Sequence, residues 1–252
     1  MNLGKKKLLI FIISYKASFR VKEVFDKIPF DKLKNFKTSV LISDDCSKDD
    51  TIDYAKKIKK KYKNIILNEN KINVGYGAHI KKCLNFALRN KYNYAVMIHG
   101  DGQFNPKYIP KLLSKLKNNK VSASTGSRIL YGINKVRSGG MPLYKMAGNI
   151  ILTNFFNFLM NKDFTDAHTG LWAYNLSFLK NKQFNLLTNS FNFDQEFRFK
   201  NILYGNLVEE IPIQTKYGDE RSQLHVKYAI KFFFNCLLFY LVKKRFIKLE
   251  KF

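Results

Sequence analysis

Blocks of hydrophobic residues alternate with polar, helix-like segments along the first half of the chain. Apolar runs short enough to be strands buried on both faces occur at Leu8–Ser14, Ser39–Ser43, Ile65–Leu67, Ala95–Ile98 and Val121–Thr125. The segments between them predict helices at Phe19–Ile28, Thr51–Tyr62, Ala78–Arg89 and Pro106–Leu116. This alternation predicts an α/β fold in which a mainly parallel central sheet is flanked by helices on both faces.

The second half of the chain adds apolar helices and another strand. Ala147–Met160 is almost free of charge and has polar residues at four-residue spacing, which predicts an amphipathic helix whose apolar side contacts either the core or a membrane. A strand is expected at Leu207–Ile213. Phe232–Val242 runs for eleven residues without a charge, too short for the ~20 apolar residues that cross a bilayer. We therefore expect an α/β domain over residues 1–224 and a C-terminal amphipathic helix over residues 225–252.

The net charge of the chain indicates which classes of molecule it favours as binding partners. The 252 residues include 45 Lys and Arg but only 19 Asp and Glu, which gives a net charge of +26. Such a charge favours nucleic acid, an anionic membrane or phosphorylated small molecules, although the lysines are scattered and compositional bias explains them equally well. No helix-turn-helix, zinc or RNA-binding signature is present, so nucleic acid is the remotest of these partners.

The number and spacing of the cysteines indicate in which kind of cellular compartment the protein is found. Cys46, Cys83 and Cys236 are odd in number and have no CxxC spacing, which argues against a disulfide framework or a zinc site and for a reducing compartment. Basic residues at Lys5–Lys7 precede an apolar run of only six residues without a small-residue cleavage site. This start predicts a buried strand rather than a signal peptide, and we expect a cytoplasmic protein.

A glycine-flanked carboxylate follows the strand Ala95–Ile98, in the turn His99-Gly-Asp-Gly-Gln103. The glycines on either side of Asp101 allow a tight turn and a close approach to a bulky ligand. Open α/β sheets bind ligands beyond the carboxyl ends of their strands, where this turn lies. The alternative is an ordinary strand-to-helix turn, because Asn105 and Pro106 are residue types that begin helices.

Adjacent carboxylates mark a second turn, after the strand Ser39–Ser43. Asp49 or Asp50 can cap the following helix, but capping does not explain Asp44 and Asp45. Neighbouring carboxylates repel each other unless a ligand supplies hydrogen-bond donors or a cation. A nucleobase N–H and a ribose hydroxyl are suitable donors.

A third turn contains Asn73, Gly75 and Gly77 and leads into a helix. It lacks the third glycine of the dinucleotide-binding fingerprint, since Ile80 occupies that position. Its backbone can nevertheless approach a phosphate at the helix N-terminus.

In their order and spacing, these turns resemble the motifs of the family 2 glycosyltransferases with the GT-A fold. The resemblance is nearest to the polyprenyl-phosphate branch, typified by dolichyl-phosphate mannose synthase, and covers most of the chain. The matching segments are Asp44–Asp49 (D-D-x-S-x-D), Asn73–Ala78 (N-x-G-x-G), His99–Gln103 (D-x-D-x-Q), Gly126–Arg128 (G-S-R), the acceptor-side loop Asp166–Trp172, Asp194–Glu196 and Tyr217–Leu224.

The resemblance implies a role for each matching residue. Asp101 and Gln103 would hold Mg²⁺ or Mn²⁺, Arg128 would guide an acceptor phosphate, and Asp194 or Glu196 would be the general base for a hydroxyl acceptor. The candidate catalytic residues are Asp101, Arg128, Asp194 and Glu196. The residues expected to bind the nucleotide sugar are Ser14, Asp44, Asp45, Asn73, Gly75, Gly77, His99, Arg221 and Ser222.

The chain departs from the family pattern at two places. His99 replaces the first Asp of D-x-D, which removes one carboxylate; Mg²⁺ often uses only one or two carboxylates together with phosphates and water, so Asp101 can suffice. Ile13-Ser-Tyr-Lys16 stands where the family has P-x-Y/N-x-E, so the acid expected to contact the donor base is missing.

The resemblance therefore implies an inverting, metal-dependent transfer of a sugar from a nucleoside diphosphate sugar to a membrane acceptor, polyprenyl phosphate above all. A sugar hydroxyl of a growing cell-surface glycan is the alternative acceptor. The basic residues around the tail, Lys227, Lys231 and Lys243–Arg245, suggest an anionic membrane surface on the inner face of the membrane. Docking of the tail on the core, or on a second copy in a homo-oligomer, is equally compatible with its pattern.

Overall fold

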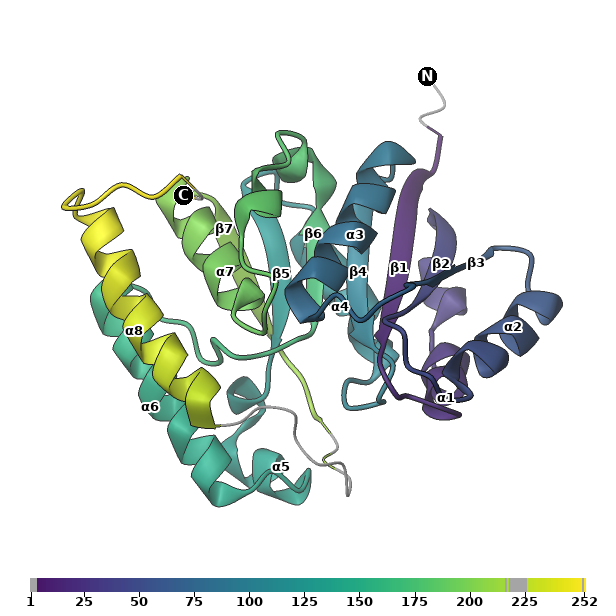
Figure 1. The fold of residues 1–252 in the computed structure, drawn as a ribbon, viewed down its shortest axis with the longest axis horizontal. Coiled ribbons are helices and arrows are strands. Elements are labelled where there is room, and N and C mark those ends of the chain that lie inside the picture. Colours follow the sequence, from purple (N-terminus) through teal and green to yellow (C-terminus); the bar gives the residue numbers. More distant parts are fainter. Residues whose placement is uncertain (1–3, 216, 218–225, 251) are drawn as a thin grey trace.

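A seven-stranded sheet forms the centre of the computed structural model, which describes residues 4–215, 217, 226–250 and 252. The strand order is β3-β2-β1-β4-β6-β5-β7 (Figure 1). The strands are β1 (Lys6–Ser14), β2 (Phe36–Asp44), β3 (Ile65–Glu69), β4 (Tyr94–His99), β5 (Val121–Ser127), β6 (Trp172–Asn175) and β7 (Leu207–Pro212). All neighbours pair in parallel except β6, which is antiparallel to both β4 and β5. The predicted mainly parallel α/β fold is confirmed.

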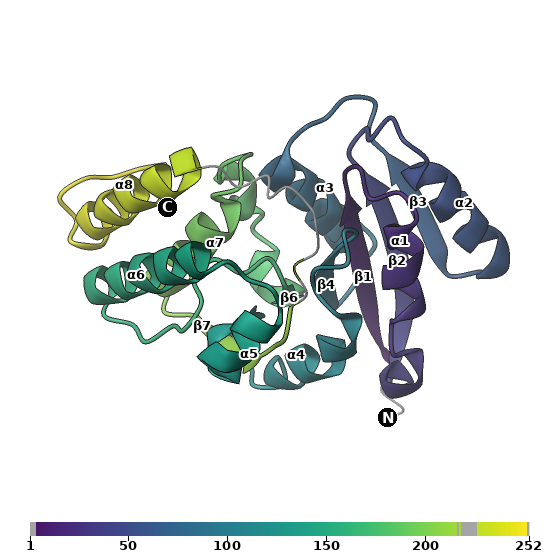
Figure 2. The same cartoon turned by 90° about the horizontal axis from the view of Figure 1, so that it is seen from below.

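Helices cover both faces of this sheet. One face packs against α1 (Arg20–Asp26), α2 (Thr51–Lys61) and α4 (Ile109–Lys115), and the other packs against α3 (Tyr76–Arg89) and α7 (Phe193–Leu203). Figure 2 shows α3 and α4 on opposite sides of β4 and β6. Short 3₁₀ turns occupy Phe30–Leu33, Pro106–Tyr108, Ile129–Tyr131, Leu176–Leu179 and Gln183–Leu186.

Strand β1 shows why its sequence is apolar throughout. Successive side chains of a strand point to opposite faces of the sheet. Leu8, Ile10 and Ile12 accordingly join the core under α1, α2 and α4, whereas Leu9 and Phe11 join the core under α3 and α7. A strand buried on both faces needs hydrophobic residues at every position, and this requirement made the strand visible in the sequence.

Beyond β7, two long helices lie side by side (Figures 1 and 2). They are α6 (Leu143–Met160) and α8 (Val226–Lys243), and the short helix α5 (Ile133–Ser138) precedes α6. Phe156 of α6 and Phe239 of α8 are buried with Phe199 of α7 in a third hydrophobic cluster. The C-terminal helix thus docks on the core through one face. Over the described part of the chain, no helix is both long and apolar enough to cross a membrane.

Gly77, on the first turn of α3, is in close contact with another segment of backbone. Its N–H donates a hydrogen bond to Asn189 O at 2.9 Å, and a Cβ built on it would lie 2.4 Å from Thr188 O. Gly148, within α6, has no atom within 4 Å of an equivalent Cβ. A methyl group therefore has no room at Gly77 but has open space at Gly148.

We expect Gly77→Ala to destabilise the protein by about 1–3 kcal/mol, because the methyl group would overlap the Thr188 carbonyl and displace backbone. Gly148→Ala is the matched control and should stabilise by about 0.5–1 kcal/mol, since only the conformational entropy of the unfolded chain changes. Urea unfolding followed by circular dichroism measures both. Equal unfolding midpoints for the two variants would contradict the close approach at Gly77.

Candidate active site

Three turns follow the carboxyl ends of β2, β3 and β4, in the lower part of Figure 1. In the strand register, Ser14 of β1 pairs with Asp44 of β2, and Ile13 pairs with His99 of β4. The sheet order therefore places the Asp44–Asp45 turn and the central turn on either side of β1. The turn at residues 70–75 follows β3 and is joined to the second turn by hydrogen bonds.

Asp44 and Asp45 are both buried, and each organises a loop. Asp44 Oδ2 accepts a hydrogen bond from Ser47 N at 2.8 Å, and its Oδ1 accepts one from the Ser47 hydroxyl. Burial raises the pKa of Asp44 above its ordinary value. These bonds explain how the turn retains a buried carboxylate before any ligand binds.

Asp45 connects the second turn to the third. Its Oδ1 accepts hydrogen bonds from Asn70 Nδ2 at 2.8 Å and from Val74 N at 3.0 Å, and its Oδ2 accepts one from Gly75 N at 3.1 Å. Gly75 has φ +86°, a conformation that glycine adopts without strain. Asn73 Oδ1 also accepts from Gly75 N, at 3.1 Å. The predicted nucleotide-binding residues of these two turns are therefore parts of one hydrogen-bonded structure.

The central turn approaches β1 very closely. A Cβ on Gly100 would lie 2.4 Å from Ser14 Oγ, so only glycine fits there. The Ser14 hydroxyl oxygen is buried and has no hydrogen-bond partner among the described residues. Asp101 Oδ1 accepts a hydrogen bond from Gln103 N at 2.9 Å, and Gly102 between them has φ +81°.

The central turn has few side chains that could act as ligands of a metal ion. Within the described residues, no group of three or more His, Cys, Asp or Glu side chains could hold a metal. Asp101 offers one carboxylate whose Oδ1 is held by the backbone of Gln103. Such a donor set fits Mg²⁺ or Mn²⁺ only if a bound diphosphate supplies further oxygen ligands, as is common for these hard cations.

His99 faces the protein rather than the open end of the turn. A Cβ on Gly170 would lie 2.7 Å from His99 Cε1, and the Phe104 ring packs edge-on at 5.2 Å between centroids. Burial lowers the pKa of His99, although the charge of Asp101 opposes the shift. His99 is therefore neutral at neutral pH, and it joins the central turn to the segment that contains Gly170.

Tyr76 links His99 to Asp194. The Tyr76 hydroxyl donates to Asp194 Oδ2 at 2.7 Å and lies 3.4 Å from His99 Nε2. The other oxygen of Asp194, Oδ1, is buried without a partner in the described part of the chain. Burial raises the pKa of Asp194 to about 7, although the hydrogen bond from Tyr76 lowers it. Sequence reasoning missed Tyr76, whose only signal was its position between the glycines of the third turn.

Glu196, the other candidate base, has a different environment. It is buried, and its Oε2 accepts a hydrogen bond from Thr188 N at 2.7 Å. Thr188 belongs to the segment that packs against Gly77. Glu196 thus supports the loop before α7, whereas Asp194 connects to the central turn.

Arg128 forms a buried ion pair with Asp166. Its Nε and Nη2 lie 2.6 Å and 2.8 Å from the two carboxylate oxygens, and its Nη1 donates to Tyr217 Oη at 2.7 Å. Burial alone would raise the pKa of Asp166, but the charge and hydrogen bonds of Arg128 hold it well below its ordinary value. The sequence suggested Arg128 as a ligand for an acceptor phosphate. In the structure all three nitrogens of this guanidinium contact protein groups, and its role toward a phosphate stays a prediction.

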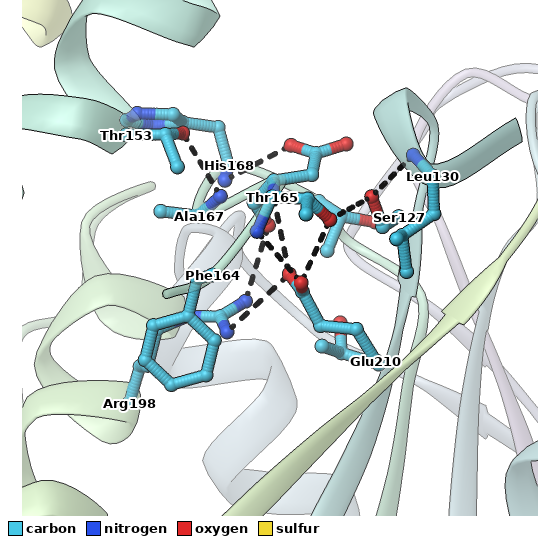
Figure 3. Close-up of polar contacts among 12 residues, drawn as sticks. Ser127, Leu130, Thr153, Phe164, Thr165, Ala167, His168, Arg198 and Glu210 are labelled. Atoms are coloured by element: carbon cyan, nitrogen blue, oxygen red, sulfur yellow. Dashed lines mark hydrogen bonds and ion pairs between the residues drawn. The ribbon is translucent and has the colours of Figure 1, made fainter. Parts of the chain in front are cut away.

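Arg198 and Glu210 form a second ion pair (Figure 3). Glu210 of β7 accepts hydrogen bonds from Thr165 N at 2.7 Å and from Asp166 N at 3.1 Å. Arg198 of α7 is fully buried, with Nη1 3.9 Å from Glu210 Oε1 and its guanidinium 4.4 Å from the centre of the Phe164 ring. Arg198 and Glu210 were not predicted as site residues, because no motif in the sequence distinguishes them from other residues of a helix or a strand.

Trp172 and Asn105, two other residues of the sequence motifs, have structural contacts. Trp172 is fully buried and its Nε1 donates to Thr169 O at 3.0 Å, so it belongs to the core, as a lone tryptophan usually does. Arg221 and Ser222 lie outside the described residues. Asn105 caps the turn after the central motif, where its Oδ1 accepts from Lys107 N at 2.9 Å.

Comparisons with known proteins agree with this fold and these motifs. The sequence model for "Glycosyl transferase family 2" matches residues 10–181. An uncharacterised protein of Methanocaldococcus jannaschii is 34% identical over 160 residues, which are 60% of this chain and 66% of the relative, slightly less than two thirds of its length. UDP-N-acetylglucosamine–dolichyl-phosphate N-acetylglucosaminyltransferase of Methanococcus voltae is 27% identical over 191 residues, 71% of this chain and 73% of that protein.

Among solved structures, glucosyl-3-phosphoglycerate synthase from Mycobacterium tuberculosis, in complex with Mn²⁺, UDP and glucosyl-3-phosphoglycerate, superposes with a TM-score of 0.62. The superposition covers 94% of this chain and 80% of that chain at 11% sequence identity. At this identity the likeness concerns the fold, which both chains share.

The buried pair predicts a large stability effect. Arg128→Met should destabilise the protein by about 3–5 kcal/mol, because it leaves the Asp166 carboxylate buried without its cation. Lys115→Met is the matched control, since Lys115 and Glu209 form a half-exposed pair at 3.2 Å that should contribute less than about 1 kcal/mol. Urea unfolding measures both variants, and adding Asp166→Asn and the double variant Arg128→Met/Asp166→Asn completes the cycle that gives the coupling energy. A fully stable Arg128→Met protein with weakened phosphate binding would restore the role that the sequence suggested.

Proposed function

The chain belongs to glycosyl transferase family 2, and on this premise we propose that it is an inverting, metal-dependent enzyme that transfers a sugar from a nucleoside diphosphate sugar to polyprenyl phosphate. The observation that carries the proposal is that three turns converge at one edge of the sheet. Asp44 and Asp45 lie in one turn and Asp101 in another, and the third turn, at residues 70–75, is hydrogen-bonded to Asp45. Ligands of open α/β sheets bind at this edge.

The residues of this edge have distinct tasks in the proposed reaction. Asp45 fixes the loop whose backbone lies beside the nucleotide, because it accepts hydrogen bonds from Val74 and Gly75. Gly100 has no side chain, so the central turn lies directly against Ser14, and this close packing leaves room for a bulky diphosphate. Asp101 and Gln103 would hold the divalent cation, which neutralises negative charge on the leaving diphosphate.

The acceptor is proposed from two observations. A relative is named for transfer to dolichyl phosphate, and the helices beyond β7 expose apolar side chains. Phe158 of α6 is 82% exposed and Phe234 of α8 is 62% exposed. Lys231 and Lys243–Arg245 flank the apolar part of α8, so this surface suits an anionic membrane that contains a lipid acceptor. We propose that the protein is peripheral on the inner face of that membrane.

One observation favours the second acceptor class, a sugar hydroxyl. Such an acceptor needs a general base, and Asp194 is a buried carboxyl whose pKa is raised by burial to about 7. Its Oδ1 is available for a new hydrogen bond within the described structure. A phosphate acceptor needs no base, because its second pKa is near 6 and it is already a dianion at neutral pH.

Asp101→Asn should abolish transfer and leave the fold intact, since the carboxamide oxygen can still accept the hydrogen bond from Gln103 N but cannot neutralise a cation. A metal's charge stabilisation is worth several kcal/mol, so we expect a loss of about 10³-fold or more. Asp31→Asn, an exposed residue before β2, is the control and should retain full activity. Transfer assays with a panel of nucleotide sugars and Mg²⁺ or Mn²⁺ measure this. Near-normal turnover of Asp101→Asn at low metal concentration would refute the site.

Asp194→Asn and Glu196→Gln, made separately, distinguish the acceptors. For polyprenyl phosphate we expect each variant to lose less than about 100-fold, because no proton has to be removed. For a hydroxyl acceptor, Asp194 must be ionised, so the rate should rise with pH through about 7 and Asp194→Asn should remove that dependence. A loss of about 10³-fold in Asp194→Asn would reject the phosphate acceptor and favour the hydroxyl.

The exposed faces of α6 and α8 should confer affinity for anionic lipid. Phe158→Ser combined with Phe234→Ser should reduce flotation with vesicles that contain phosphatidylglycerol, because both side chains are exposed and apolar. Leu186→Ser, which changes a side chain 56% exposed and distant in sequence from both helices, is the control. Point variants are used because truncation would remove Phe239 from the core. Unchanged flotation of the double variant would place membrane contact elsewhere.

A further inference from the structure

The side chain of Tyr76, the first residue of α3, contacts three other segments of the chain. Its ring stacks on the Phe191 ring at 5.2 Å between centroids and packs edge-on against the His99 ring at 5.7 Å. A Cβ on Gly170 would lie 3.3 Å from the Tyr76 hydroxyl oxygen. These contacts hold the phenol ring from several sides, so its hydroxyl group has a defined position.

The hydroxyl group of Tyr76 engages one oxygen of Asp194. Tyr76 Oη donates to Asp194 Oδ2 at 2.7 Å, whereas Asp194 Oδ1 is buried without a partner within the described residues. Because a phenol has a single proton, its bond to Asp194 leaves only oxygen lone pairs for His99 Nε2, 3.4 Å away. Oδ1 is therefore the atom of Asp194 that can still accept a hydrogen bond.

The charge state of Asp194 depends on a small set of neighbours. Burial raises the pKa of Asp194 to about 7, whereas the hydrogen bond from Tyr76 and the charge of Arg198 lower it. Within the described residues, the titratable groups that face Asp194 are Tyr76 of α3, Tyr174 of β6 and Arg198 of α7, with His99 of β4 behind Tyr76. Tyr76 therefore favours the ionised form of a carboxyl group that burial would otherwise keep protonated.

We propose that Tyr76 is a positioning residue for sugar transfer, whose hydroxyl group holds the Asp194 carboxylate in one orientation beside the central turn, an inference that rests on the proposed function. Without this hydrogen bond, both oxygens of a buried carboxylate would be unpaired, which is costly. The backbone of the turn before Tyr76 is itself hydrogen-bonded to Asp45. Tyr76 thus connects that turn to the acid at the start of α7.

The first test needs no substrate. Asp194 binds its proton more tightly in the folded than in the unfolded chain, so the folded state loses stability as the pH rises through about 7. In Tyr76→Phe this loss should continue to higher pH, and its urea midpoint should fall further below that of the wild type at about pH 8 than at about pH 6. In the Asp194→Asn background the pH-dependent part of this difference should vanish. A difference of equal size at both pH values would overturn the proposal.

Tyr94→Phe is the matched control, because it removes the same hydroxyl group from a buried tyrosine. Tyr94 begins β4, at the opposite end of the strand from His99, and its Oη accepts a hydrogen bond from Lys6 Nζ at 3.1 Å. The shift of its urea midpoint should be the same at both pH values, and its rate of transfer should equal that of the wild type.

The second test measures transfer. Tyr76→Phe should lower kcat about tenfold, as expected for the loss of one hydrogen bond to a charged group, and leave KM for the nucleotide sugar within about twofold. In the Asp194→Ala background, which has no carboxylate to position, Tyr76→Phe should lower kcat by less than about twofold. Independent, multiplicative losses in kcat would overturn the proposal. Absence of transfer by the wild type would instead reject the proposed function, and the pH dependence of stability would still decide whether Tyr76 acts on Asp194.

Discussion

Four buried charges fix one wall of the candidate site. Asp166, Arg128 and Arg198 are buried and Glu210 is largely buried, so water solvates these charges poorly and each depends on its partner and on hydrogen bonds to the backbone. These contacts join β5, β7 and α7 to the segment that contains Asp166. Gly170, four residues later, then packs directly against His99. The position of the central turn thus depends on an ion-pair network in another part of the fold.

The sequence predicted the parallel half of the fold well, for a physical reason. Strands buried on both faces are apolar at every position, and Leu8–Ser14 shows this without any knowledge of its neighbours. Strand β6 escaped prediction because it has only four residues, Trp172–Asn175, which are too few to show a clear pattern. The positions of the turns after β2, β3 and β4 were also predictable, since glycines and acids interrupt the apolar pattern there.

Side-chain partners were much less predictable. The motif around Arg128 suggested a phosphate ligand, but its partner Asp166 lies 38 positions away and is brought near only by the fold. Tyr76 is invisible for a similar reason, because its contact with Asp194 spans 118 positions. The sequence left two interpretations of the tail open. The structure shows that Phe239 packs into the core, whereas contact of the exposed Phe234 with a membrane stays a prediction. The roles assigned to the site residues stay predictions that the variants described above address.

The antiparallel strand β6 has a consequence for how the molecule opens. It is the strand through which β1–β4 and β5–β7 are joined, with four registered pairs to β4 and three to β5. By contrast, β1 and β2 share nine. The β5–β6 ladder is therefore the shortest in the sheet, and its amides should exchange with solvent through a smaller local opening than those of β1. In such an opening the part of the sheet that contains β1–β4 and the part that contains β5 and β7 would separate as two cooperative units.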